Sequence, residues 1–499
     1  MIGFDACLMG TLETAMVLEP YADYMIASEE LEPGIGWYYT EWLSALSDDT
    51  SIETIDLGKK MIDDYVTEVA DKAPRNQGTL SIIDLAEMKG TIGDVLTDFS
   101  VATKGLIDAK DYQVVSNARA SAKEFAKSSK LNQIDFIHFS KSMGTPEALE
   151  LADVLDGMVK YNRTTSNITN ANGVSIYFPL QSLGKVGDMV DTYEEIGMED
   201  SYTDCVRSFA SVVAGGQIVA ERNTGTENLL GSLLGGASGG LGNIGADLIG
   251  NLLTSTLSGG GLGSLLGSNN DWVDEEAMTS SADYYAENQF DASALIITNK
   301  DGQQVLALSE EQWSLVQYME QNVFIDDGEG FIDLGLDNTY EWNDGGDLIM
   351  DYDGTWMSLN GNIVGYYLIS DDHNGDTYSI RGRVPAMLND VPVNIILEFN
   401  PSDPYGSVLG AQLDYDIEAE TPTIAKGLLP INEGDQIDFL CDYYTYEGGY
   451  SDSYYLGDTY IATGEWYIEN LDISQYPYEM AYRITDIYDN HFWTPTISD

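Results

Sequence analysis

The chain has 499 residues, with 83 Asp or Glu against 22 Lys or Arg, and a formal net charge of −61. A field of this sign repels nucleic acid and anionic membranes, which argues against both as partners, and attracts cations and basic peptides. An equally open interpretation is that the acidity keeps an exported protein soluble. The hydrophobic share of 43% is that of a globular protein, and the length allows two or three domains.

The first part of the chain, residues 1–222, alternates short apolar runs with amphipathic helical patterns. Strands are predicted at 2–6, 23–28, 79–83 and 173–178, and helices at 12–18, 51–71, 110–127 and 145–160. An alternation of strands and helices is typical of an α/β fold with a parallel sheet.

Residues 223–279 differ in composition from the rest of the chain. The stretch "LLGSLLGGASGGLGNIGADLIGNLLTSTLSGGGLGSLLGS" carries a single charge, Asp247, and consists mostly of Gly, Leu, Ser and Asn. Glycine at this density prevents a stable isolated helix, so we predict a flexible linker or insertion. The leucines exceed what a spacer requires, which leaves open a segment that docks on a partner or a membrane.

From residue 280 to 499 the hydrophobic period changes to two, which predicts a separate β-rich domain, a sandwich or a barrel. The stretch "TWMSLNGNIVGYYLIS" predicts a hairpin with Asn360 and Gly361 in a type I′ turn. One helix is predicted in this region, at 309–321.

The three cysteines, Cys7, Cys205 and Cys441, are far apart and show no CxxC spacing, so we predict free thiols and neither a disulfide framework nor a thiolate zinc site. No run reaches the roughly 18 apolar residues of a membrane helix. No signal peptide precedes the first predicted strand, so an export signal would lie upstream of Met1.

The opening segment "MIGFDACLMG" places Cys7 between a predicted strand and a helix, where α/β folds carry chemistry. A helix amino terminus near Gly10 would stabilise a thiolate at this position. Strand alternation puts Asp5 on the same face as Cys7, where a carboxylate is a poor base for a thiol but can hold a cationic group. From these residues alone, a buried core cysteine beside a capping aspartate is the favoured interpretation.

The segment "GFDACLMGTLETAMVLEPYADYMIASEELEPGIGWYYTEWL" resembles the nucleophile segment of the clostripain family of cysteine peptidases, which have a caspase-like fold. The resemblance continues through "LSIIDLAEM", "NGVSIYFP" and "YRITDIYDNHFWT". It implies a cysteine endopeptidase that cleaves protein or peptide substrates after Arg, and less readily after Lys. By resemblance Cys7 is the nucleophile, with its N–H in the oxyanion hole, and Asp5 recognises the basic side chain. Glu29, after the second predicted strand, is a candidate second pocket acid.

The catalytic histidine of the family precedes the nucleophile strand, and none of the three histidines of this chain replaces it. His138 is predicted on a helix, His373 in a turn and His491 after a late strand. Because a dyad needs a base within hydrogen-bond reach, we expect the chain to be inactive alone. Two origins are open: a processed heavy chain whose light chain carries the histidine, or a truncated gene product, which Met1 favours.

The resemblance also suggests calcium, but acid-glycine loops such as "DDGEG" (326–330) and "DYDG" (351–354) lack the EF-hand spacing, so we name no metal ligand. A secreted or cell-surface bacterial protein is expected. Two other functions stay open: a non-catalytic binding protein whose acidic β-domain recognises a cell-surface or basic partner, and an inert fragment.

Overall fold

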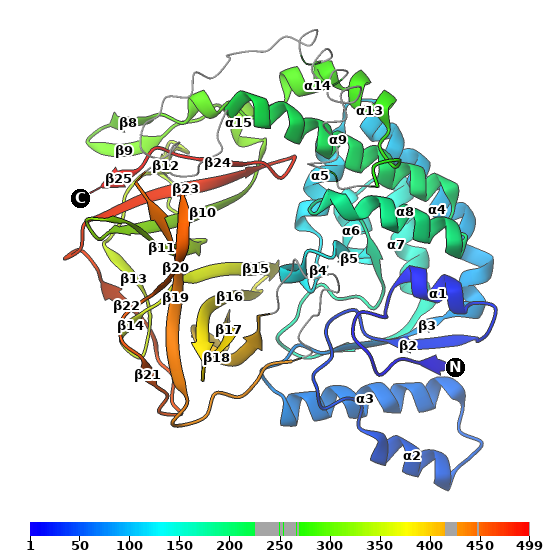
Figure 1. The fold of residues 1–499 in the computed structure, drawn as a ribbon. Helices are drawn as coiled ribbons and strands as arrows, with labels where there is room; N and C mark the ends of the chain where they lie inside the picture. The colour runs from blue at the N-terminus through cyan, green and yellow to red at the C-terminus, as the bar shows by residue number, and fades with distance from the viewer. Residues whose placement is uncertain are drawn as a thin grey trace.

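A computed structural model describes residues 1–224, Ile249, Leu253, Leu266, 269–414, 427–446 and 449–498. Helices and short strands make up residues 1–224, whereas strands dominate from residue 297 onward. The two parts lie side by side, with the N-terminal part on the right of Figure 1 and the β-rich part on the left. None of the described helices combines the length and the apolar character that a membrane span needs.

The N-terminal part contains two small sheets packed among helices. The first sheet has the strand order β1 (Ile2–Gly3), β2 (Tyr24–Ala27), β3 (Thr79–Asp84) and β6 (Val159–Thr164). The second sheet contains β4 (Glu124–Phe125), β5 (Gln133–Asp135) and β7 (Ser175–Tyr177). The helices of this part are α1 (Leu12–Leu18), α2 (Tyr39–Asp48), α3 (Thr54–Lys72), α4 (Leu85–Asp108), α5 (Tyr112–Ser121), α6 (Phe136–Met143), α7 (Pro146–Met158), α8 (Val186–Ile196) and α9 (Asp200–Thr224).

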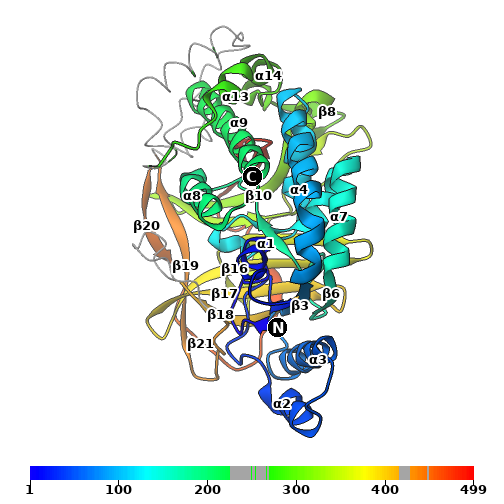
Figure 2. The ribbon, with the colours of Figure 1, turned by 90° about the vertical axis from the view of Figure 1, so that its right-hand side faces the viewer.

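This arrangement confirms the predicted α/β class, with a difference in strand direction. β1 and β2 are parallel, with Ile2 opposite Met25, but β2–β3 and β3–β6 are antiparallel. A single helix, α1, connects β1 to β2, as a parallel crossover requires. Two helices, α2 and α3, connect β2 to β3, and they lie together at the bottom of Figure 2. β3 runs opposite to β2.

The β-rich part is built on one large sheet. Its main path is β18 (Asp403–Leu413), β17 (Val391–Asn400), β16 (Thr377–Leu388), β15 (Tyr366–Asn374), β11 (Gly330–Asp337), β10 (Val316–Asp326), β23 (Tyr478–Asp486) and β24 (His491–Trp493). Joined to this path are β19 (Gln436–Thr445), β20 (Tyr450–Tyr455), β21 (Tyr460–Ile461) and β25 (Ile497–Ser498). Two smaller sheets contain β12 (Leu348–Ile349), β9 (Gln303–Leu306) and β8 (Ile297–Lys300), and β14 (Asn362–Ile363), β13 (Thr355–Leu359) and β22 (Ile468–Asp472). The short helices of this part are α13 (Glu275–Ser280), α14 (Ala282–Glu287) and α15 (Glu310–Trp313).

Two sequence predictions in this part have opposite outcomes. The type I′ turn is confirmed, since Asn360 and Gly361 join β13 to β14 with φ of 50° and 80°. The helix predicted at 309–321 is wrong beyond its first turn, because only α15 is helical and β10 begins at Val316. β10 pairs with β11 on one side and β23 on the other, so tertiary strand pairing overrides the local helical pattern.

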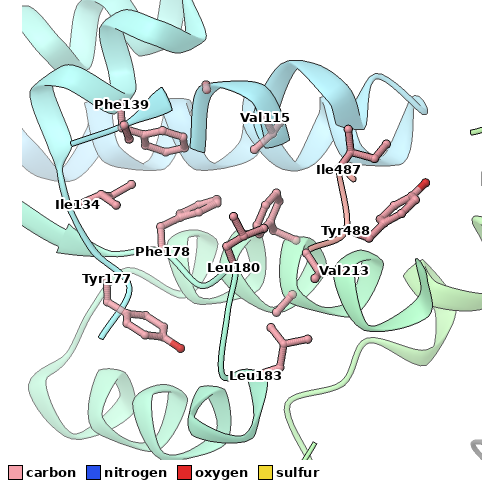
Figure 3. Packing of buried hydrophobic residues seen from close by; sticks show 14 of the residues in the cluster. Val115, Ile134, Phe139, Tyr177, Phe178, Leu180, Leu183, Val213, Ile487 and Tyr488 are labelled. Carbon is pink, nitrogen blue, oxygen red and sulfur yellow. The ribbon is translucent and has the colours of Figure 1, made fainter. Parts of the chain in front are cut away.

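The hydrophobic core is shared by the two parts of the molecule. One cluster of buried side chains includes residues from α1 to β24, and Figure 3 shows Ile487 and Tyr488 packed among the helices of the N-terminal part. The Tyr112 ring stacks on Phe209 and on Tyr488, with centroids 5.3 and 5.5 Å apart, and its hydroxyl donates to Ile487 O at 3.1 Å. The boundaries at 222 and 280 therefore separate two kinds of secondary structure but not two cores, contrary to the expected separate domains.

Most of the segment 223–279, predicted as a linker, lies outside the described residues. Three of its described residues, Ile249, Leu253 and Leu266, are fully buried and belong to the shared core.

Candidate active site

Cys7 lies in the turn that follows β1, in contact with the loop that follows β2. The partly buried Cys7 Sγ accepts a hydrogen bond from Glu32 N at 3.2 Å and lies 3.9 Å from Glu32 O. α1 begins further on, and its amino terminus is capped by Thr11, whose hydroxyl accepts from Thr14 N at 3.0 Å. The hydrogen bonds of the thiol are thus with the loop after β2, and not with the first turn of α1 as the sequence suggested.

The segment carrying Cys7 is hydrogen-bonded to β2 and to the loop that follows it. Phe4 N donates to Ile26 O at 3.0 Å, Leu8 N to Glu30 O at 3.3 Å, and Gly10 N to Ser28 O at 2.7 Å. A Cβ at Gly10 would lie 2.9 Å from the carbonyl carbon of Ser28, so this close approach requires glycine. Leu8 adopts a φ of 60°, a left-handed conformation that costs a non-glycine residue about 1–2 kcal/mol. The backbone beside the thiol is therefore strained and held by its neighbours.

The loop of residues 28–32, which contacts Cys7, is organised by one buried hydroxyl. Thr79 Oγ1 accepts from Glu29 N at 3.0 Å and from Glu30 N at 3.2 Å, and it lies 2.9 Å from Ser28 Oγ. Thr79 is the first residue of β3 and is 1% exposed. The first sheet thus fixes the position of the amide that binds the Cys7 sulfur.

Two acidic side chains come from the segments around the thiol. Asp5 is exposed and accepts from Tyr39 Oη at 3.0 Å. Glu32 is 2% exposed and accepts from Trp37 Nε1 at 3.2 Å. Burial raises the pKa of Tyr65, and negative charge on Glu32, Cys7 and Asp5 raises it further, as expected if these groups lie together. A partly exposed thiol beside two carboxylates suits a ligand with a cationic group.

The structure places Glu29 in the interior, at 1% exposure. Its Oε2 accepts from Gly173 N at 2.8 Å, and its carboxyl hydrogen-bonds that of Asp135. Burial, followed by the negative charge of Asp135, raises the pKa of Glu29, so the two carboxyls share a proton. Asp135 in turn caps α6 by accepting from His138 N at 2.6 Å. In this arrangement Glu32, which the sequence analysis did not name, is the buried acidic residue that contacts Cys7, through its backbone N–H and C=O.

None of the three histidines contacts Cys7. His138 is on α6, as predicted, and its Nδ1 accepts from Lys123 N at 2.9 Å. His373 lies in β15 and not in a turn, with Nε2 2.6 Å from Asp371 Oδ1. His491 is the first residue of β24, and its Nδ1 lies 3.0 Å from Thr485 Oγ1. The thiol has no imidazole partner among the described residues.

The other two cysteines have the environment of core residues. Cys205 and Cys441 are 0% and 2% exposed, and all three thiols are free, as predicted. Burial raises the pKa of Cys205 to about 12 and also raises that of Cys441. Such thiols are unreactive at neutral pH, so Cys7 is the candidate nucleophile on exposure alone.

The carboxylates of the acid-glycine loops accept hydrogen bonds from backbone N–H groups. Within the described ranges, no group of three or more His, Cys, Asp and Glu side chains is arranged to hold a metal ion. In the loop 326–330, Asp327 Oδ1 accepts from Glu329 N at 2.8 Å and from Gly330 N at 2.9 Å. This carboxylate forms the turn between β10 and β11.

Residues 1–229 match the model of the clostripain family. This part of the chain, which contains the Cys7 turn and both small sheets, therefore belongs to the clostripain family of cysteine peptidases. No curated protein matches the chain.

Solved structures of bacterial proteases show a weaker likeness. A cysteine protease from B. fragilis is 18% identical, with 40% of this chain and 87% of that chain covered and a TM-score of 0.30. A clostripain from Bacteroides thetaiotaomicron, in complex with a peptide inhibitor, is 18% identical and has a TM-score of 0.27. The match covers 35% of this chain and 76% of that chain. An inactive zymogen protease from Parabacteroides distasonis is 16% identical and has a TM-score of 0.27. The match covers 39% of this chain and 57% of that chain. At these scores the family membership rests on the match over residues 1–229.

Proposed function

We propose that the chain is the nucleophile-bearing part of a cysteine endopeptidase that cleaves after Arg, and less readily after Lys. The observation that carries the proposal is the partly exposed Cys7 thiol beside Asp5 and Glu32. Carboxylates near a nucleophile select a cationic side chain on the substrate. Arg is preferred because its planar guanidinium forms two parallel hydrogen bonds with a carboxylate, which a Lys ammonium does not.

In this mechanism, the Cys7 thiolate attacks the carbonyl carbon that follows the basic residue. The carbonyl oxygen gains negative charge, which the backbone N–H of Cys7 stabilises. No hydrogen bond within the described residues occupies that N–H. The amine leaves with a proton from the base, and water then hydrolyses the acyl-enzyme.

The pocket for the basic side chain is assigned to Asp5 and Glu32, with Glu32 in the role that the sequence suggested for Glu29. Gly36, at φ of 64°, lies against Asp5, and a Cβ there would be 3.2 Å from both carboxylate oxygens. Glycine thus keeps the approach to Asp5 open.

The general base for Cys7 is proposed to come from outside these 499 residues, because all three histidines are engaged elsewhere. β1 pairs only with β2 among the described strands, so its second edge can accept a further strand. A light chain carrying the histidine would fit this edge, and the chain by itself is expected to be inactive. Secretion is part of the same proposal by family resemblance, which also makes calcium the candidate cofactor, without an assigned ligand.

The test is reconstitution with the upstream part of a related clostripain-family peptidase. The chain alone should not cleave an arginyl fluorogenic substrate, and the pair should cleave it. Cys7→Ala should abolish the gain. Asp5→Asn should lower kcat/KM for the arginyl substrate about tenfold or more, as the loss of a charge-assisted hydrogen bond predicts.

Glu41→Gln, which removes an exposed acid from α2, is the matched control and should leave cleavage unchanged. Full activity of the isolated chain would show that one of its own histidines is the base. An inactive pair with Cys7 reduced and accessible would contradict the peptidase proposal.

The second candidate is a non-catalytic protein that binds basic partners through its acidic surface. The absence of an imidazole contact to Cys7 in the described chain favours it. Binding of a basic peptide that persists in Cys7→Ala and Asp5→Asn, with no cleavage on reconstitution, would select this function.

A further inference from the structure

A small pocket lies between the loop after β2 and the large sheet, at the junction of the two parts of the molecule. Its volume is about 100 Å³, and its lining includes Glu30, Arg75 and Lys127 from the N-terminal part and Ser370, Arg381 and Gln412 from the sheet. A space of this size holds a few water molecules or one short side chain.

The charge of this pocket is opposite to that of the protein. Four cationic side chains line it against two carboxylates, in a chain whose net charge is −61. Two of the cations are neutralised: Lys123 pairs with Asp372 at 2.8 Å, and Arg381 Nε donates to Glu398 Oε2 at 2.8 Å.

The other two cations, Arg75 and Lys127, form no ion pair in the part of the chain that the structure describes. Arg75 Nη1 has one long hydrogen bond, 3.5 Å to Leu409 O. Lys127 Nζ lies 5.3 Å from the centre of the Tyr318 ring. The carboxylates whose charge acts on Lys127, those of Glu124 and Asp372, already pair with Arg119 and Lys123, so the Lys127 ammonium keeps hydrogen-bond donors for a ligand in this pocket.

Each carboxylate of the lining has one oxygen engaged, and Glu124 Oε1 has no hydrogen-bond partner among the described residues. Glu30 Oε1 accepts from Leu31 N at 2.8 Å and from Ala126 N at 3.3 Å, and Glu124 pairs with Arg119 at 3.1 Å. Three neutral side chains of the lining, those of Asn76, Ser370 and Gln412, make no hydrogen bond among the described residues. The pocket thus offers two cations and several neutral donors, which is a donor set for a carboxylate.

The pocket adjoins the loop that holds Cys7. Leu31 lines the pocket, and the next residue, Glu32, donates its N–H to the Cys7 sulfur. Lys127 begins η1 (Lys127–Ser129), directly after β4, which Figure 1 shows beside β15. A peptide extended across Cys7 can therefore reach this pocket with a neighbouring side chain.

We propose that the pocket binds the carboxylate of an Asp or Glu side chain of a peptide whose basic residue is held at Cys7. The proposal rests on the peptidase function for its substrate, but the binding itself requires no catalysis. It assigns a preference for an acidic residue near the cleavage site in a protein whose surface otherwise repels acids.

The first experiment measures binding of glutarate, a mimic of the Glu side chain, to the full Cys7→Ala chain by calorimetry. Lys127→Gln and Arg75→Gln should each weaken glutarate binding about tenfold, and Lys127→Arg should restore it. Lys130→Gln removes an exposed charge three residues away, and should have no effect. Equal weakening by Lys130→Gln, or tighter binding of inorganic phosphate than of glutarate, would overturn the carboxylate assignment.

The second experiment compares two fluorescent peptides in the same Cys7→Ala chain, each with one Arg and either Glu or Gln a few residues away. The Glu peptide should bind about tenfold more tightly, and Lys127→Gln should abolish this difference without changing the affinity of the Gln peptide. Glutarate binding with no preference for the Glu peptide would show a site for free carboxylates and overturn the substrate proposal. A Glu preference in a chain that never cleaves on reconstitution would leave the pocket standing and contradict the peptidase function alone.

Discussion

Buried carboxylates are stabilised in different ways around Cys7 and in the large β-sheet. Two of those in the sheet, Glu320 and Glu398, form ion pairs across neighbouring strands, and Arg483 Nε donates to Glu320 Oε2 at 2.8 Å. Around Cys7 the buried acids Glu29 and Glu32 are held by hydrogen bonds from backbone and ring N–H groups. Ion pairs between strands fasten the sheet, whereas the acids near Cys7 are held in place by N–H donors of the loop and of the strands around it.

The sharpest test of this contrast is thiol reactivity. Cys7 should react with iodoacetamide at least about 100-fold faster than Cys205 and Cys441 at pH 7.4, because thiols that are buried with a raised pKa contain almost no thiolate. Peptide mapping after timed alkylation measures the three rates. In denaturant all three should react alike, and native labelling of Cys205 or Cys441 at the rate of Cys7 would contradict the assignment.

The ion pairs of the sheet should be costly to break. Glu320→Gln leaves Arg483 without its partner and should lower the free energy of unfolding by about 2–3 kcal/mol at pH 7. Urea unfolding followed by circular dichroism gives the change. Asp63→Asn breaks the exposed pair with Arg163 and should cost less than about 1 kcal/mol, so equal losses would show that burial does not matter.

Because the segment carrying Cys7 lies so close to the loop after β2, we expect one added methyl group at Gly10 to destabilise the protein. Gly10→Ala brings a Cβ to 2.9 Å from backbone and should destabilise the protein by about 1–3 kcal/mol, with faster alkylation of Cys7 as the turn loosens. Gly90→Ala, in α4 with nothing within 4 Å, should instead stabilise by up to about 1 kcal/mol. Effects of the same sign would argue against the contact.

The smallest effect is expected from the buried pair of carboxyl groups, Glu29 and Asp135, and it depends on pH. Because the pKa of Glu29 is raised above 4.5, the folded protein binds more protons than the unfolded chain above that pH. Stability contributed by the protonated pair is therefore lost as pH rises through the folded pKa, by at most about 1.4 kcal/mol per pH unit.

Glu29→Gln mimics the protonated acid, so the free energy of unfolding should decline less between pH 5 and 7 in this variant. At pH 7 the substitution should be neutral or stabilising, whereas Glu320→Gln should be destabilising. Urea midpoints at each pH measure it, and Glu41→Gln controls for loss of a charge. A large destabilisation by Glu29→Gln at pH 7 would mean that the carboxylate is needed in its charged form.

Local patterns predicted many elements well. The predicted strand at 79–83 and the helix at 145–160 are found as β3 (Thr79–Asp84) and α7 (Pro146–Met158), since period and capping residues are properties of the local sequence. The predicted helix at 110–127 ends at Ser121, and β4 follows, because Glu124 and Phe125 pair with β5. As with β10, a partner strand distant in sequence decided against the helix.

The sequence by itself determined that an α/β part precedes a β-rich part, that a turn lies at Asn360 and that the thiols are free. It also carried the resemblance that singled out Cys7 and Asp5. Each of these follows from local spacing or from a specific motif. Tertiary structure alone decided that Glu32, and not Glu29, contacts the thiol. Both acids are in one short loop, and their directions depend on how Thr79, Gly173 and Trp37 hold that loop. The tertiary structure also decided that the two parts share one core and that Arg75 and Lys127 line the same pocket. Both depend on contacts between residues that are far apart in the chain.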